Sequence, residues 1–149
     1  MQPHYDEHDF SFVTHHRIRS HECDRQGVMH NARYIEMLEV ARIEFCRDVL
    51  KVPIDQWTFA QHHKFYFVRN VLNYFHPARF DDELTILTRV SSIGRTSITL
   101  EQIVNRTRDA MRILEAEAVM VSVDEVTDNP KEIEPELRQR IIAAGASQK

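Results

Sequence analysis

The fold is decided by residues 31–51, NARYIEMLEVARIEFCRDVLK, whose apolar residues recur at helical spacing. The recurring positions are Ile35, Leu38, Ala41 or Arg42, Phe45 and Val49. This periodicity predicts one long amphipathic helix. Asn31 can cap its first turn, because an Asn side chain accepts hydrogen bonds from the amides there. Pro53 ends the run, because proline cannot continue a helix.

Around this helix the sequence predicts extended segments at about 10–22, 62–75, 82–93, 96–106 and 111–124. In three of them every second residue is expected on one buried face: Leu84, Ile86, Thr88 and Val90; Ile98, Leu100, Gln102 and Val104; Val119, Val121 and Val123. A period of two is typical of half-buried antiparallel strands. A short helix at about 134–145 follows, with Pro135 in its first turn.

One long helix packed on an antiparallel sheet buries the apolar faces of both, which predicts an α+β fold. The length of 149 residues suits one domain, and no linker or repeat interrupts it. We therefore expect a single domain over residues 1–149. The periodicity alone is compatible with several topologies.

Composition excludes several classes of function. The formal net charge is −4 and no basic run is present, so the sequence does not predict a nucleic-acid binder. No apolar run is long enough for a membrane span, and the first residues do not resemble a secretory signal. Cys23 and Cys46 lack metal-ligand spacing, which indicates reduced thiols and a cytoplasmic location.

The chemistry is expected just before the helix, in residues 23–30, CDRQGVMH. The amides at a helix N-terminus lack internal partners and stabilise negative charge, including a developing oxyanion. Gly27 permits a tight turn and a close ligand approach. Asp24 can act there as nucleophile or general base. On spacing alone, an Asp before a helix is more often a turn or cap residue.

The same stretch resembles the 4-hydroxybenzoyl-CoA thioesterase-like family of hot-dog acyl-CoA thioesterases. The resemblance covers residues 14–125 and is carried by Asp24, Gly27, His30, Asn31 and Tyr34. It continues through the helix YIEMLEVAR at 34–42, then NYFHPARFDDEL at 73–84 and GRTS at 94–97. The family's fold is an antiparallel sheet of about five strands wrapped around one long central helix.

The resemblance implies hydrolysis of an acyl-CoA to a free acid and CoA. Asp24 would attack the thioester carbonyl or activate water, and the backbone amide of Asn31 would polarise the carbonyl oxygen. Gly27 and Tyr34 would shape the pocket, with Tyr34 also holding the loop. Arg95 and Ser97 would approach the CoA arm. The family needs no cofactor or metal, and its homodimers pair further into tetramers, with the acyl chain between subunits.

The sequence departs from the family pattern at two positions. Val28 stands where many relatives have His, and His30 stands where many have Asn. His30 can replace the lost hydrogen bonds as an orienter or proton donor, since its charge changes near neutral pH. An exposed histidine near the helix cap is an equally good interpretation.

Other candidate residues are weaker. A catalytic Cys23 would need a neighbouring base and a lowered thiol pKa, which the spacing does not indicate. The histidine pairs at 15–16 and 62–63 point to opposite sides of a strand, so no metal site is predicted. Glu36 and Glu39 lie near the loop, where ion pairs with neighbours such as Arg42 are favoured over catalysis.

Two further functions stay open from sequence. The first is an acyl-carrier-protein thioesterase, for which Arg17, Arg19, Arg25 and Arg33 would form the basic rim. The second is a non-catalytic hot-dog protein that binds an acyl ligand without turnover. The acyl group, and the choice between an anhydride intermediate and direct attack by water, are not encoded in the motifs.

Overall fold

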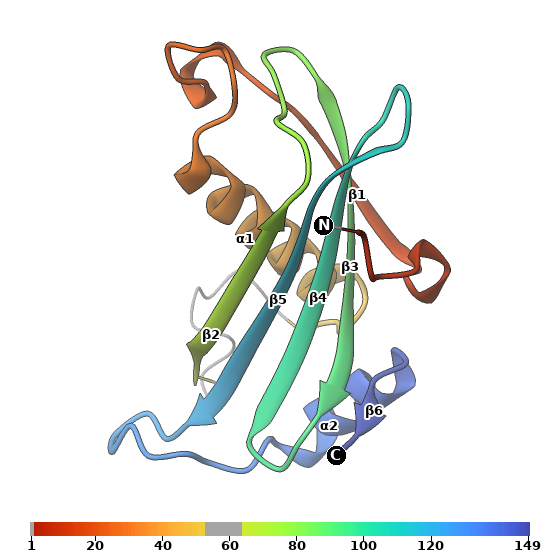
Figure 1. The fold of residues 1–149 in the computed structure, drawn as a ribbon. Coiled ribbons are helices and arrows are strands. Elements are labelled where there is room, and N and C mark those ends of the chain that lie inside the picture. The colour runs from red at the N-terminus through yellow and green to blue at the C-terminus, as the bar shows by residue number, and fades with distance from the viewer. Residues whose placement is uncertain (1, 53–63) are drawn as a thin grey trace. The chain divides into compact units, whose positions relative to one another are not determined.

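The predicted long helix is α1, Asn31–Asp48, in a computed structural model that describes residues 2–52 and 64–149 (Figure 1). Its buried residues are Tyr34, Met37, Leu38, Ala41, Arg42, Phe45 and Cys46. Two predicted core positions are wrong. Ile35 is 44% exposed, and Val49 is 37% exposed and lies beyond the helix end. The spacing is helical, but the buried stripe is centred one residue away from Ile35.

The start of α1 also differs from the expectation. Asn31 is the first helical residue, so His30 holds the capping position. Within the described chain the Asn31 side chain accepts no amide hydrogen bond, and the predicted cap is not formed. The backbone amide of Asn31 nevertheless belongs to the first helical turn, as predicted.

Five predicted strands are present, with slightly different bounds: β1 Phe12–Arg17, β2 Lys64–Tyr74, β3 Glu83–Ile93, β4 Ser97–Arg106 and β5 Met111–Val123. Their order in the sheet is β1-β3-β4-β5-β2, and an unpredicted short strand, β6 Ser147–Gln148, pairs in parallel with β3. This sheet and the long helix α1 form the α+β hot-dog fold. Pro53, Trp57, His62 and His63 lie outside the described residues.

The first strand is shorter than predicted. β1 pairs antiparallel with β3 from Phe12 opposite Thr88 to Arg17 opposite Glu83. A 3₁₀ turn, η2 Ser20–Glu22, then replaces the extended chain expected up to residue 22. Another 3₁₀ turn, η1 Glu7–Asp9, precedes β1. The polar run after β1 therefore leaves the sheet at Arg17 and turns toward the Asp24 loop.

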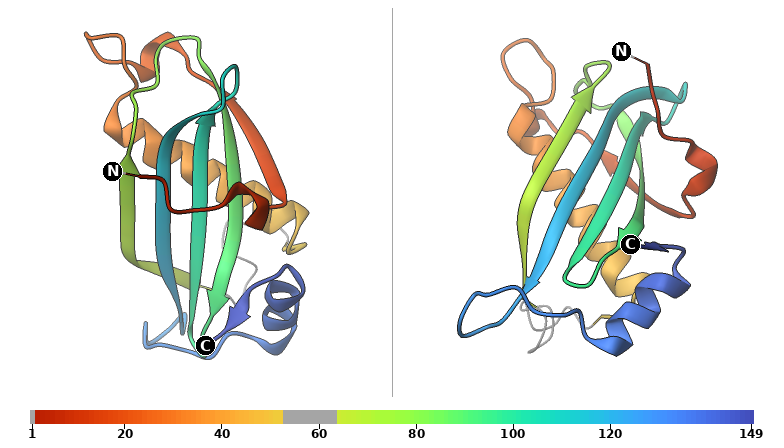
Figure 2. Two further views of the ribbon diagram at one scale, coloured as in Figure 1. Left: turned by 45° about the vertical axis from the view of Figure 1, so that its right-hand side comes forward. Right: turned by 60° about the horizontal axis from the view of Figure 1, so that its bottom comes forward.

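The chain divides into two compact units. The first comprises Met1–Arg42, Leu72–Thr88 and Gln102–Ala116. Its main core joins the first turns of α1 to the sheet and consists of Ile18, Met29, Tyr34, Met37, Leu38, Ala41, Ala78, Leu84, Ile86, Val104, Ile113, Leu114 and Ala116. In the left view of Figure 2, the N-terminal segment crosses the opposite face of the sheet. There, Glu115 accepts hydrogen bonds from the amides of His4 and Tyr5, both at 3.1 Å.

The second unit comprises Ile43–Val71, Arg89–Glu101 and Glu117–Lys149. It contains the predicted tail helix, α2 Pro135–Ala143, which buries Leu137 and Ile141. Arg140 donates to the carbonyls of Leu50 and Lys51 at 3.2 and 3.1 Å. These bonds fix α2 against the segment that follows α1 within this unit.

One predicted strand face needs correction. In β5, Val119 and Val121 are only half-buried, whereas Ala118, Met120 and Ser122 are buried. Each face of β5 carries apolar residues, so the period of two did not identify which face is buried. In β3 and β4 the predicted inner residues are buried as expected.

No helix in the described part of the chain combines the length and apolar character that a membrane span requires.

Candidate active site

Asp24 lies in a tight turn between η2 and α1. Its amide donates to the Val28 carbonyl at 2.9 Å, and the Gly27 amide donates to the Asp24 carbonyl at 3.1 Å. An isolated antiparallel bridge joins Cys23 to Met29 on either side of the turn. The turn is therefore closed on itself by backbone hydrogen bonds.

The two oxygens of the Asp24 carboxylate have different surroundings. Oδ1 accepts hydrogen bonds from the amides of Gln26 at 2.8 Å and Val28 at 3.3 Å. This is an Asx turn, in which the side chain replaces a backbone acceptor. Within residues 2–52 and 64–149 nothing donates to Oδ2. One oxygen thus fixes the carboxylate, and the other is available for chemistry.

Gly27 completes this turn with a backbone angle that favours glycine. Its φ is +78°, in the left-handed region that side chains disfavour. A Cβ built on it would meet nothing within 4 Å. The backbone conformation, rather than crowding, therefore accounts for glycine at this position.

The turn is also tied to the chain segment before β3. The Met29 amide donates to the Ala78 carbonyl at 2.8 Å, and the Phe80 amide donates to the Gly27 carbonyl at 3.4 Å. An antiparallel bridge joins Val28 to Arg79. Residues 27–29 consequently lie between residues 23–24 on one side and residues 78–80 on the other, with hydrogen bonds to both.

The segment before β3 is itself fixed by Asp82, which is 9% exposed. Its Oδ2 accepts the Arg79 amide at 2.9 Å. Its carbonyl accepts the Ile18 amide at 2.9 Å, just beyond the end of β1. Asp82 therefore connects the segment that holds the Asp24 turn to the sheet.

The helix start lies beside the turn. The His30 amide donates to the Glu22 carbonyl at 2.9 Å, and the Arg33 amide donates to the His30 carbonyl at 3.0 Å. The amides of Asn31 and Ala32 come first in α1, where helix geometry provides no internal acceptor. Cys23, Asp24, Arg25, Gln26 and His30 line an open hollow at this point.

Tyr34 is buried one turn into α1. Its phenol oxygen accepts the Ala78 amide at 3.2 Å, and its ring makes a T-shaped contact with the ring of Tyr74 at a centroid distance of 5.4 Å. Burial raises the pKa of the Tyr34 phenol above its ordinary value, despite the opposing hydrogen bond from Ala78. The phenol is therefore neutral at physiological pH and acts as a packing and hydrogen-bonding group.

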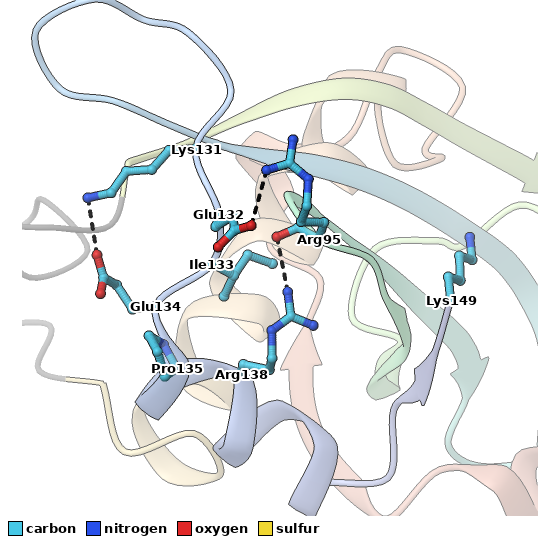
Figure 3. Close-up of a pocket in the computed structure, with 8 residues that line it drawn as sticks. All are labelled: Arg95, Lys131, Glu132, Ile133, Glu134, Pro135, Arg138 and Lys149. Atoms are coloured by element: carbon cyan, nitrogen blue, oxygen red, sulfur yellow. Dashed lines mark hydrogen bonds and ion pairs between the residues drawn. The ribbon is translucent and has the colours of Figure 1, made fainter.

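Arg95 and Ser97 belong to the second unit, whereas Asp24, Gly27, His30, Asn31 and Tyr34 belong to the first. The Gly94 amide donates to the Ser97 carbonyl at 2.8 Å and closes the turn between β3 and β4. Figure 3 shows Arg95 at a pocket that also exposes Lys131, Arg138 and Lys149. Arg95 pairs with Glu132 at 3.3 Å, and Arg138 donates to the Arg95 carbonyl at 3.0 Å.

Sequence reasoning missed one pair of side chains next to the turn. Glu22 is 8% exposed, and His16 Nε2 lies 2.9 and 3.0 Å from its two carboxylate oxygens. Burial alone would raise the pKa of Glu22. Hydrogen bonds from the Arg19 amide and His16 outweigh burial, and the pKa lies below its ordinary value. The sequence signal that could have found this pair is the period-two alternation of β1, which places His16 on the same face as Phe12 and Thr14.

The weaker candidates gain no support from their surroundings. Burial, followed by the charges of Glu22 and Asp24, raises the pKa of the Cys23 thiol, which disfavours the nucleophilic thiolate. No group of three or more metal-ligating side chains occurs in the described ranges. Glu36 pairs with Arg33 at 2.8 Å rather than with Arg42, and Glu39 is exposed.

Comparison with known proteins shows the family to which the chain belongs. Residues 18–141 match the model of the thioesterase-like superfamily, and the chain belongs to this family. The long-chain acyl-CoA thioesterase FadM of Escherichia coli K12 is 28% identical over 125 residues, covering 84% of this chain and 92% of FadM. The acyl-CoA thioester hydrolase YbgC of Escherichia coli O6:H1 is 32% identical over 116 residues, covering 77% of this chain and 84% of YbgC.

Among solved structures, the probable thioesterase YbaW from Escherichia coli superposes with a TM-score of 0.76 at 27% identity. The match covers 90% of this chain and 98% of YbaW. The resemblance to hot-dog thioesterases that the sequence indicates is thus confirmed for both the family and the fold.

Proposed function

We propose that this protein hydrolyses the thioester of an acyl-CoA to a free carboxylic acid and CoA. The observation that carries the proposal is the asymmetric Asp24 carboxylate. Its Oδ1 is held by two backbone amides, and Oδ2 has no partner in the described chain. His30 lines the same hollow as Asp24 and immediately precedes the first amides of α1, which can bind an oxyanion. Relatives named as acyl-CoA thioesterases support the same reaction.

In the proposed reaction the thioester oxygen accepts a hydrogen bond from the Asn31 amide. The positive end of the α1 dipole then stabilises the charge that develops on this oxygen. Asp24 Oδ2 either attacks the carbonyl carbon or removes a proton from an attacking water. Attack by Asp24 forms an anhydride and releases CoA as a thiolate, and water then cleaves the anhydride. Attack by water yields acid and CoA in one addition–elimination.

The other predicted site residues have supporting roles in this proposal. Gly27 gives the turn its conformation, and Tyr34 holds the segment at Ala78 that pairs with the turn. His30 lines the hollow beside Asp24 and can orient the substrate. Arg95 and Ser97 are proposed to approach the phosphate-bearing arm of CoA. At the pocket in Figure 3, Arg95 and Lys131 pair with Glu132 and Glu134, so the complementary charge would come from Arg138 and Lys149.

The test is release of CoA thiol from short, long and aromatic acyl-CoAs by wild type and Asp24→Asn. Asparagine keeps the Oδ1 acceptor for the turn but removes the basic oxygen, so turnover is expected to fall at least about a hundredfold. Asp124→Asn is a matched control, because Asp124 Oδ1 also accepts two backbone amides, those of Val126 and Thr127 at 2.9 Å. A fully active Asp24→Asn enzyme would contradict the proposed mechanism.

A second candidate substrate is an acyl group on an acidic carrier protein. The guanidinium groups of Arg19, Arg25 and Arg79 make no ion pair with any acid of the described chain, and all three residues are exposed. Arg17 and Arg33, by contrast, pair with acids, Arg33 with Glu36 at 2.8 Å. Unpaired arginines beside the Asp24 turn would attract an acidic partner.

Charge reversal separates the two substrates. Arg25→Glu and Arg79→Glu should weaken turnover of acyl-carrier protein strongly at low salt and much less at high salt, because docking of two proteins is screened. Arg47→Glu is the control, since Arg47 is exposed and also unpaired within the described residues. Binding of acyl-CoA without turnover of either substrate would instead favour a non-catalytic acyl-binding protein.

We also infer a cytoplasmic homodimer that pairs further into a tetramer. β2 ends the sheet order and exposes Tyr66, Phe67 and Val68, with Val68 61% exposed. An apolar edge strand is a template for pairing with another chain. Val68→Lys should lower the mass measured by light scattering, whereas Val126→Lys, at a site 91% exposed, should not. An unchanged mass for Val68→Lys would exclude this edge from the assembly.

A further inference from the structure

Glu22, two residues before Asp24, is a buried carboxylate with a complete set of partners. One oxygen accepts the Arg19 amide at 2.7 Å, and both oxygens lie within 3.0 Å of His16 Nε2. His16 belongs to β1, so this contact attaches η2 to the sheet. Because Glu22 is ionised, the nearby His16 nitrogen carries its proton and donates.

The backbone of Glu22 makes a second set of bonds. Its amide donates to the Arg19 carbonyl at 3.0 Å, and its carbonyl accepts the His30 amide at 2.9 Å. His30 immediately precedes the first helical residue, Asn31. Glu22 therefore contacts the sheet through its side chain and the residue before α1 through its carbonyl. The Asp24 turn lies in the chain between Glu22 and His30.

We propose that Glu22, anchored by His16, is a positioning residue that fixes the distance between the Asp24 carboxylate and the first amides of α1. This inference rests on the proposed function, in which both groups act on one thioester. The turn is already closed by its own hydrogen bonds, so loss of Glu22 should displace it as a unit. Catalysis is sensitive to such displacement, because a misplacement of about 1 Å can lower a rate about a hundredfold.

Glu115 provides a matched control. It is also a buried carboxylate of the first unit, it accepts two backbone amides, and it pairs with a histidine, His4, and with Arg112. Its partners hold the N-terminal segment rather than the Asp24 turn. Removing either carboxylate should lower stability, but only removal of Glu22 should disturb the site.

The experiment compares Glu22→Ala, Glu22→Gln, His16→Phe and Glu115→Gln at a temperature where circular dichroism shows each to be folded. Glu22→Ala is expected to lower kcat about 10- to 100-fold with little change in KM, since binding groups are retained. Glu22→Gln keeps an acceptor for the Arg19 amide and should recover much of this loss. His16→Phe should fall between them, and Glu115→Gln should keep the wild-type kcat.

Amide hydrogen exchange measured by NMR gives a readout that does not depend on turnover. The amides of Met29 and His30 donate to carbonyls outside the turn, those of Ala78 and Glu22, and should exchange faster in Glu22→Ala but not in Glu115→Gln. Unchanged exchange at these amides, or a kcat equal to wild type in Glu22→Ala, would overturn the positioning role. If wild type hydrolyses no substrate, the proposed function fails, and the exchange data still decide whether Glu22 positions the turn.

Discussion

The phenol oxygen of Tyr34 accepts the backbone amide of Ala78 at 3.2 Å, while the carbonyl of the same alanine accepts the Met29 amide at 2.8 Å. Ala78 is fully buried, so neither bond competes with water. Ala78 therefore hydrogen-bonds through its amide to Tyr34 of α1 and through its carbonyl to Met29 of the turn. The position of the Asp24 turn relative to α1 depends on this contact within the first unit.

Replacing Tyr34 with phenylalanine should therefore destabilise the protein by about 1–3 kcal/mol, because the buried Ala78 amide loses its acceptor. Urea unfolding measures this change. Tyr74→Phe is the control: its ring also takes part in the edge contact, but its hydroxyl has no hydrogen-bond partner in the described chain. Equal losses in the two variants would show that the hydroxyl of Tyr34 contributes nothing specific.

Gly27→Ala should cost about 1–2 kcal/mol of stability, because alanine disfavours the left-handed backbone that this turn requires. Asparagine tolerates that region better, so Gly27→Asn should lose less. Gly145→Ala, at φ +107°, is a control for backbone strain in the second unit. We expect all three to lower the melting temperature and only the Gly27 variants to lower turnover per folded molecule. Wild-type stability in Gly27→Ala would contradict the turn geometry.

Gln102 joins the sheet to the middle of α1. Its amide nitrogen donates to the Leu38 carbonyl and to Thr88 Oγ1, both at 3.1 Å, and its oxygen accepts from buried Arg42 at 3.0 Å. Gln102→Leu keeps the volume but removes a hydrogen bond to a buried charge, so the free energy of unfolding should fall by about 2–3 kcal/mol. Gln139→Leu, on the exposed side of α2, should change it by less than about 0.5 kcal/mol. A neutral Gln102→Leu would mean that water or repacking replaces these bonds.

The helix and the strands were predictable because their periodicity is determined by burial on one face. Leu84 and Ile86 alternate with the polar residues Glu83 and Thr85, so the start of β3 indicates which face is the inner one. In β5 the neighbouring residues Val119 and Met120 point to opposite faces and are both apolar, so the pattern was compatible with burial of either face. Ile35 failed for a similar reason, since apolar Tyr34 beside it belongs to the buried stripe instead.

The site was predictable only where the chemistry depends on side-chain type. Asp24 and Gly27 have properties that few other residues share, and the motif contains both. Ala78 acts through its backbone amide and carbonyl, which every non-proline residue has, so no sequence signal marks it. Glu22 lies in a polar run that shows neither helical nor strand periodicity. Nothing in such a run distinguishes a buried acid from a solvated one.

Glu22 also predicts how stability depends on pH. The folded-state pKa of this carboxyl lies below its ordinary value of 4.5, because the Arg19 amide and His16 outweigh the effect of burial. A lowered folded-state pKa means that the unfolded chain binds the proton more readily. The stabilisation is therefore complete above pH 4.5 and is lost as the pH falls from 4.5 through the folded-state pKa.

Urea unfolding of wild type and Glu22→Gln at pH 7 and at pH 4 isolates this contribution, because the other acids titrate in both proteins. The stability difference between the two proteins should be larger at pH 7 than at pH 4. A difference that stays constant, or grows toward pH 4, would show that the Glu22 charge gains nothing from the Arg19 amide and His16.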